Sequence, residues 1–150
     1  MPITAQTQVS DTILASPDRC FGIATDLAAY PGWVPAITSV DVRAIDDLER
    51  PVEVEFQAEA MGRRTRYVLA YDYAEAPHGF SWRQTEGDLT RRLEGSYRFA
   101  PSDEQPGATA VTYELDIELA VPLPGFVKRR AETKIVQAAL SQFRQRVESS

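Results

Sequence analysis

The feature that most constrains this chain is the strict alternation of apolar and polar residues in VTYELDIELAV, residues 111–121. One parity holds only apolar or aromatic side chains: Val111, Tyr113, Leu115, Ile117, Leu119 and Val121. The other parity holds Thr112, Glu114, Asp116 and Glu118. Side chains on a strand point alternately to its two faces, so this pattern predicts a strand with one buried and one solvated face. Such a strand requires a sheet that is covered on one side.

The same period of two recurs in earlier runs and extends the prediction from one strand to a sheet. These runs are PVEVEFQAEA (51–60), RRTRYVLAYDY (63–73), HGFSWRQ (78–84) and LTRRLEGSYRF (89–99). The turn signals MGRR, EAPHG, EGD and SDEQPG separate the strands, and connections this short join antiparallel neighbours. Period-two spacing begins near residue 38, and residues 4–14 alternate weakly. These patterns therefore predict an antiparallel sheet of about seven strands.

A first helix is predicted over residues 17–27, after the first strand. Ser16 is suited to cap this helix, and Pro17 to occupy its first position. Pro31 and Pro35 interrupt the next stretch, DLAAYPGWVPAI at 26–37, and bias the residues before them away from helical angles. We expect at most a short helical turn there.

A long helix is predicted at the C-terminal end, after VPLPG. Apolar residues form two adjacent strips there: Val127, Ala131, Ile135 and Ala138, and then Val136, Leu140, Phe143 and Val147. An apolar face this broad indicates a helix that lies in a groove rather than on a flat surface.

Composition excludes several classes of function. A length of 150 residues fits a single domain, here 1–150, and a net charge of -6 argues against a nucleic-acid surface. Cys20 is the only cysteine, so no disulfide framework is expected. The sequence shows no signal peptide and no apolar run long enough to span a membrane. We expect a cytoplasmic protein without stable membrane insertion.

Motifs for catalysis are also missing. No phosphate loop, metal-ligand spacing or serine elbow is present, so we predict no metal and no cofactor, and catalytic residues remain unassigned. His78, the only histidine, falls in a predicted turn, where a surface position is the simplest interpretation. Cys20 on the apolar face of the first helix is interpreted as a small buried hydrophobe.

The order of elements, together with specific motifs, resembles the START-like superfamily, also called SRPBCC or helix-grip proteins. ASPDRCFGIATDLAAYPGWVPAITSVDV at 15–42 is similar to the opening helix of the family and the proline- and tryptophan-containing turn that follows it. GDLTRRLEGSYRFAP and TAVTYELDIELAVPLPGFV are similar to its late strands and the loop into its last helix. Within the superfamily, the resemblance is to the polyketide cyclase/dehydrase and coenzyme-Q-binding type.

This resemblance implies an α+β helix-grip fold. A curved antiparallel sheet would wrap around the long C-terminal helix, with two short helices after the first strand and a hydrophobic cavity between sheet and helix. The candidate ligand-binding residues are Trp33, Phe56, Tyr67, Tyr71, Trp82, Gln84, Arg91, Tyr97, Tyr113, Phe126 and Ile135. The tyrosine hydroxyls need partners, which either a wet or liganded cavity or backbone groups at the sheet edges would supply.

Arg91 and Gln84 are the polar candidates. Arg91 shares strand parity with Leu89 and Leu93, so simple alternation points its guanidinium inward, toward a ligand carboxylate or enolate oxygen. A bulge near EGD, or a position at the open end of the sheet, would instead turn it toward solvent. Gln84 shares parity with Phe80 and Trp82.

The leading functional hypothesis is the binding or transport of a hydrophobic or amphipathic small molecule, of the lipid, polyketide or quinone type. The alternative is a polyketide cyclase/dehydrase that uses the same cavity. Tyrosine and arginine are better proton donors than bases near neutral pH, and no inward acid/base pair is evident. A third possibility is a module that chaperones a quinone or docks on a protein partner.

Overall fold

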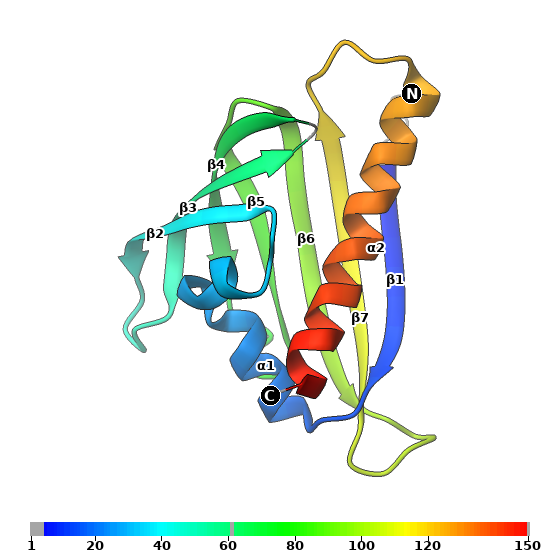
Figure 1. The fold of residues 1–150 in the computed structure, drawn as a ribbon. Coiled ribbons are helices and arrows are strands. Elements are labelled where there is room, and N and C mark those ends of the chain that lie inside the picture. Colours follow the sequence, from blue (N-terminus) through cyan, green and yellow to red (C-terminus); the bar gives the residue numbers. More distant parts are fainter. Residues whose placement is uncertain (1–4, 61, 150) are drawn as a thin grey trace.

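The computed structural model describes residues 5–60 and 62–149, and shows one sheet, a long helix in front of it and two short helical segments (Figure 1). The elements, in chain order, are β1 (Ala5–Ile13), α1 (Pro17–Thr25), the 3-10 helix η1 (Leu27–Gly32), β2 (Ile37–Ile45), β3 (Pro51–Ala60), β4 (Arg63–Asp72), β5 (Gly79–Gly87), β6 (Thr90–Pro101), β7 (Thr109–Leu119) and α2 (Gly125–Ser149).

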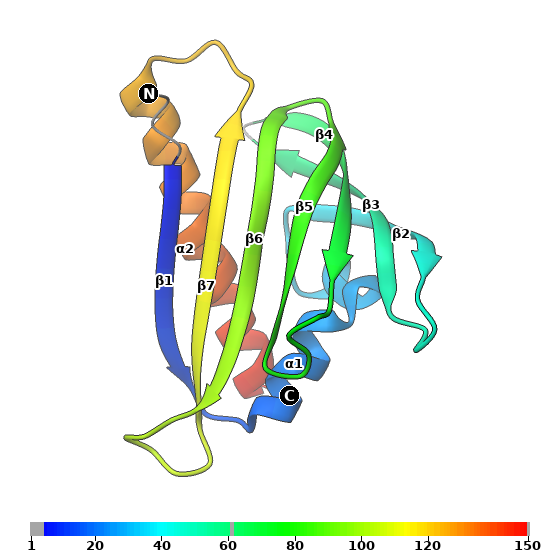
Figure 2. The same cartoon turned by 180° about the vertical axis from the view of Figure 1, so that it is seen from behind.

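The sheet has seven strands in the order β1-β7-β6-β5-β4-β3-β2, and every pairing is antiparallel. Strands β2 to β7 follow one another along the chain, while β1 joins at the far side of β7. The sheet curves around α2, which packs against β1 and β7; α1 lies beside the lower end of α2, and η1 packs against β2 (Figures 1 and 2). The predicted α+β architecture, with its seven strands and two short helical segments after the first strand, is confirmed.

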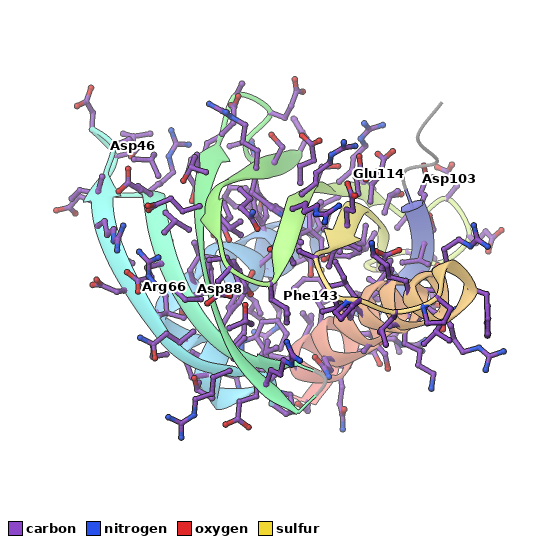
Figure 3. The ribbon with its side chains drawn as sticks, turned by 90° about the horizontal axis from the view of Figure 1, so that it is seen from above. Asp46, Arg66, Asp88, Asp103, Glu114 and Phe143 are labelled. Atoms are coloured by element: carbon purple, nitrogen blue, oxygen red, sulfur yellow. The ribbon has the colours of Figure 1, made fainter. Side chains whose placement is uncertain are left out.

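The alternation of apolar and polar residues in β7 matches the burial of its side chains. Residues 111, 113, 115, 117 and 119 are buried, and the residues between them are partly exposed. Opposite this face, α2 buries Glu132, Val136, Leu140, Phe143 and Val147. Seen from above, Phe143 points into the space between helix and sheet, whereas Glu114 lies on the outside of the sheet (Figure 3). The core therefore lies where the two predicted apolar faces meet.

Helix α1 begins as predicted but ends earlier. The Ser16 side chain accepts a hydrogen bond from the Arg19 N–H at 3.3 Å, which is the N-cap interaction. The helix ends at Thr25 rather than near residue 27, and the chain continues as η1. The Tyr30 hydroxyl donates to the Ala24 carbonyl, which fixes η1 against the end of α1.

Ion pairs cover the convex face of the sheet. Glu55 accepts from both Arg43 and Arg66, with 2.8 Å between Arg66 Nε and Glu55 Oε1, and Arg92 lies 3.2 Å from Asp116. These partly exposed pairs help to set strand register. Within residues 5–60 and 62–149, no helix is both long and apolar enough to cross a membrane.

Candidate functional site

A cavity of about 280 Å³ lies between the concave face of the sheet and α2. The sheet contributes residues from β2 to β7, the η1–β2 segment contributes Trp33, Val34 and Ala36, and α2 contributes Ile135, Ala138, Ala139 and Gln142. Its volume is close to the lower limit of about 300 Å³ for pockets that hold small ligands. The concave face is thus not completely filled by its own side chains.

Cross-strand aromatic pairs build the sheet side of this cavity. Strand register places Phe56 opposite Tyr67, Tyr71 opposite Trp82, and Tyr97 opposite Tyr113. The ring centroids of Phe56 and Tyr67 are 5.3 Å apart, and those of Tyr97 and Tyr113 are 4.9 Å apart. Such contacts add stability beyond area burial and hold the rings in place. The wall is therefore a preformed aromatic surface.

The hydroxyls of Tyr67, Tyr71, Tyr97 and Tyr113, which we call the cavity tyrosines, form no hydrogen bond with any described residue. They are not sealed off either, because Asp116 Oδ1 is the only fully enclosed and unpartnered side-chain oxygen or nitrogen in the described part of the chain. By contrast, Tyr30 donates to the Ala24 carbonyl, and Tyr73 donates to the Pro51 carbonyl at 2.6 Å. Backbone carbonyls therefore satisfy Tyr30 and Tyr73, whereas the cavity tyrosines use no backbone group of the described residues.

Burial keeps the cavity tyrosines protonated. Removal from water raises the pKa of Tyr67 to about 12 and that of Tyr71, Tyr97 and Tyr113 further above the ordinary value, and neighbouring tyrosines add to the shift for these three. At neutral pH each is an uncharged phenol that can donate one hydrogen bond.

Charge is scarce at the cavity. Among the described lining residues the only ionisable acid or base besides tyrosine is Glu59, which is exposed at the rim and lies 4.0 Å from the Arg64 guanidinium. A second carboxylate, that of Glu132, is 4% exposed and accepts the Leu119 N–H at 3.0 Å. Leu119 lines the cavity, but Glu132 does not. The lining thus provides hydrogen-bond donors without a cation.

The structure brings most of the predicted candidates to the cavity wall: Trp33, Phe56, Tyr67, Tyr71, Trp82, Tyr97, Tyr113 and Ile135. Gln84, Arg91 and Phe126 lie elsewhere. Gln84 donates to the Thr90 carbonyl at 2.9 Å and accepts from the Thr90 hydroxyl, so its amide is used within the β5–β6 end of the sheet. The side chain of Phe126 is 66% exposed at the start of α2.

The prediction from simple alternation that Arg91 points into the cavity was wrong. The pairing of β6 with β7 shifts between Thr90 and Arg92, so a bulge reverses the face to which residue 91 points. The Arg91 side chain is 68% exposed, and its guanidinium lies 3.7 Å from Glu118 on the outer face. The bulge alternative describes this residue, and inward anchoring by Arg91 is not what the structure shows.

Other residues in the lining were not singled out from the sequence, among them Thr65, Thr90, Ala138, Ala139 and Gln142. A signal for the helical ones was present, because Ile135, Ala138, Ala139 and Gln142 follow the spacing i, i+3, i+4, i+7 along one side of α2. His78 is exposed in the β4–β5 turn, and Cys20 is buried, as interpreted from the sequence.

A larger and more open hollow, of about 560 Å³, lies on the convex face over β4 to β7. Polar and acidic side chains dominate it, including Asp72, Glu94, Glu114 and Asp116. It is part of the ion-paired outer surface, and among its described lining residues only Ala70 and Trp82 carry apolar side chains, so we place the candidate site in the smaller concave cavity.

Comparisons with known proteins agree with this architecture. The family model described as polyketide cyclase/dehydrase and lipid transport matches residues 4–148. The chain is similar to a START superfamily protein from Mycobacterium smegmatis, with 23% identity and a TM-score of 0.86 over 96% of this chain and 97% of that one. Comparison with curated protein sequences gives no significant match.

Two further solved structures show the same architecture. A protein from Thermus thermophilus has 25% identity and a TM-score of 0.75, over 95% of this chain and 96% of that one. The Zhui aromatase/cyclase from a Streptomyces species has 15% identity and a TM-score of 0.79, over 97% of this chain and 94% of that one. These likenesses confirm the helix-grip fold.

Proposed function

Because the chain belongs to the polyketide cyclase/dehydrase and lipid transport family, we propose that it binds or transports a hydrophobic or amphipathic small molecule in the cavity between the sheet and α2. The observation that supports this most directly is an aromatic cavity of about 280 Å³ whose polar groups are hydroxyls without a protein partner. Lipids, polyketides and quinones all combine a large apolar surface with a few oxygens, which is the chemistry this wall complements.

The free-energy cost of leaving the cavity empty supports the proposal. An apolar void destabilises a protein by about 24 cal/mol per Å³, so a dry cavity of about 280 Å³ would cost roughly 7 kcal/mol. That is comparable with the whole stability of a typical domain, about 5–15 kcal/mol. Water in the cavity would satisfy the hydroxyls but would not restore dispersion contacts with the rings. A bound molecule that combines an apolar surface with an acceptor oxygen supplies both kinds of contact.

The alternative is a cyclase or dehydrase that acts in the same cavity. The cavity tyrosines favour it in one respect, because phenol donors stabilise the oxyanion of an enolate. Enolisation also requires a base, and tyrosines with raised pKa values do not provide one near neutral pH. Glu59 at the rim is the remaining lining carboxylate among the described residues. We therefore place binding or transport first.

Native mass spectrometry tests the proposal. The full chain is purified from its own host, measured under native conditions and extracted with organic solvent. We expect one defined hydrophobic molecule at a stoichiometry near one per chain. Ala139→Phe is the matched variant, because it adds a ring at a half-buried lining position on α2 and should reduce the bound fraction at least tenfold.

The result that contradicts the proposal is equally specific. A chain that carries no small molecule from its host, and whose melting temperature does not change with any hydrophobic compound tested, would exclude carriage in this cavity. Binding without turnover supports carriage, and conversion of a bound polyketide-like compound to a cyclised product would favour the enzyme alternative.

A further inference from the structure

We propose that the cavity selects an uncharged ring compound whose carbonyl oxygens accept hydrogen bonds from the cavity tyrosines, and that it rejects a carboxylate of the same shape. This rests on the proposed function and specifies the ligand class. It follows from three properties of the wall: its charges, its unpaired donors and its shape.

The charges exclude a buried anion. A carboxylate that leaves water pays a large desolvation penalty unless a cation or several donors compensate for it. No lysine, arginine or histidine is among the described residues of the lining. Arg91, the cation that alternation placed inside, is 68% exposed and lies beside Glu118. Glu59, at the rim, has the wrong sign to attract an anion.

The donors require an acceptor. Each cavity tyrosine presents a hydroxyl with no described protein partner, and a ligand that covers such a hydroxyl without accepting its hydrogen bond binds more weakly. A carbonyl oxygen has two lone pairs and can accept from two phenols at once. Tyr97 and Tyr113 are direct cross-strand partners, with ring centroids 4.9 Å apart, so two donors lie at one part of the wall. A pure hydrocarbon would leave these hydroxyls unsatisfied.

The shape favours rings over an extended chain. Trp82 is close to both of these tyrosines, with centroid distances of 5.7 Å to Tyr97 and 5.8 Å to Tyr113, so flat aromatic surfaces form the wall. At about 30 Å³ for each water, about 280 Å³ holds roughly nine waters. A compact bicyclic molecule fits this space and stacks on the aromatic wall.

Three naphthalenes of nearly equal shape test the proposal: 2-acetylnaphthalene, 2-naphthoate and 2-isopropylnaphthalene. Each is titrated into the full chain at pH 7.5, and binding is measured by calorimetry. We expect the ketone to bind at least tenfold more tightly than the carboxylate and several-fold more tightly than the hydrocarbon. A carboxylate that binds as tightly as the ketone would overturn the inference and leave the proposed function standing. If none of the three binds, both are overturned for compact ring compounds.

Variants test whether the hydroxyls of the cavity tyrosines cause the preference for the ketone. Tyr97→Phe/Tyr113→Phe should abolish the preference for ketone over hydrocarbon while hydrocarbon affinity changes less than twofold. Tyr67→Phe/Tyr71→Phe is the second test, should the first variant fold poorly. Tyr73→Phe is the matched control, because the Tyr73 hydroxyl donates to the Pro51 carbonyl and its side chain is not in the lining. An unchanged ketone preference in both double variants would overturn the assignment.

Discussion

Gly95 shows how one residue without a side chain shapes the cavity wall. It pairs with Trp82 across β5 and β6. A Cβ atom at residue 95 would lie 2.4 Å from the Glu114 carbonyl oxygen and 2.9 Å from Trp82 Cζ2. The first of these atoms belongs to the backbone of β7 and cannot move without disturbing the ladder. The indole therefore occupies its position because residue 95 has no side chain.

We expect Gly95→Ala to lower the free energy of unfolding by about 1–3 kcal/mol, because the added methyl group overpacks the sheet. Urea denaturation measures this change. Gly22→Ala is the control, since residue 22 lies within α1 with no atom within 4 Å of the added Cβ, and there the substitution should stabilise by about 0.4–1 kcal/mol. Equal effects at the two positions would argue against the steric account.

At the scale of elements, periodicity predicted the strands and the faces they bury, and it did so because burial on one side of a sheet enforces alternation. It did not locate the bulge between Thr90 and Arg92. That bulge depends on how β6 pairs with β7 and on the Ala120 N–H donating to the Leu89 carbonyl, which are contacts between distant parts of the chain. The prediction that Gln84 lines the cavity was wrong for a related reason. Its amide donates to the Thr90 carbonyl across the β5–β6 connection, a contact that strand parity does not reveal.

The bulge gives a prediction for Arg91→Leu. The side chain points to the outer face and contributes one long, exposed ion pair, so the free energy of unfolding should change by less than about 0.5 kcal/mol. Affinity for a cavity ligand should stay within twofold, whether the ligand is neutral or acidic. Calorimetric titration with 2-acetylnaphthalene and 2-naphthoate checks this. A tenfold loss of affinity for 2-naphthoate alone would show that Arg91 contacts the ligand in the cavity.

At the scale of the whole molecule, the six tyrosines form a single alkali-sensitive set. Burial raises the pKa of every one of them, through desolvation first and, for most of them, through repulsion from neighbouring tyrosines. The sequence grouped most of these residues on one face, but it could not show that the helix on the opposite side leaves part of that face uncovered. That depends on where α2 packs, on β1 and β7.

The folded protein should therefore lose stability in alkali. Tyr67 titrates near 10.0 when unfolded and at about 12 when folded, so between these values the fold holds a proton that the unfolded chain has released. The stability linked to this proton is fully present below pH 10 and is lost as the pH rises through about 12. Urea unfolding between about pH 8 and 11.5 should show a falling free energy of unfolding, with a shallower slope in Tyr67→Phe.

Tyrosinate absorbance provides an independent measure of the same transition, because it should rise together with unfolding rather than before it. A Cys20→Ala background removes the thiol, whose pKa is also raised by burial and whose ordinary value, 9.0, lies lower. A bound neutral ligand should move the alkaline transition to higher pH, since it binds only the fold in which the phenols are protonated. Tyrosines that ionise near their ordinary pKa of 10.0 in the folded protein, with no loss of stability, would contradict the desolvation of the cavity wall.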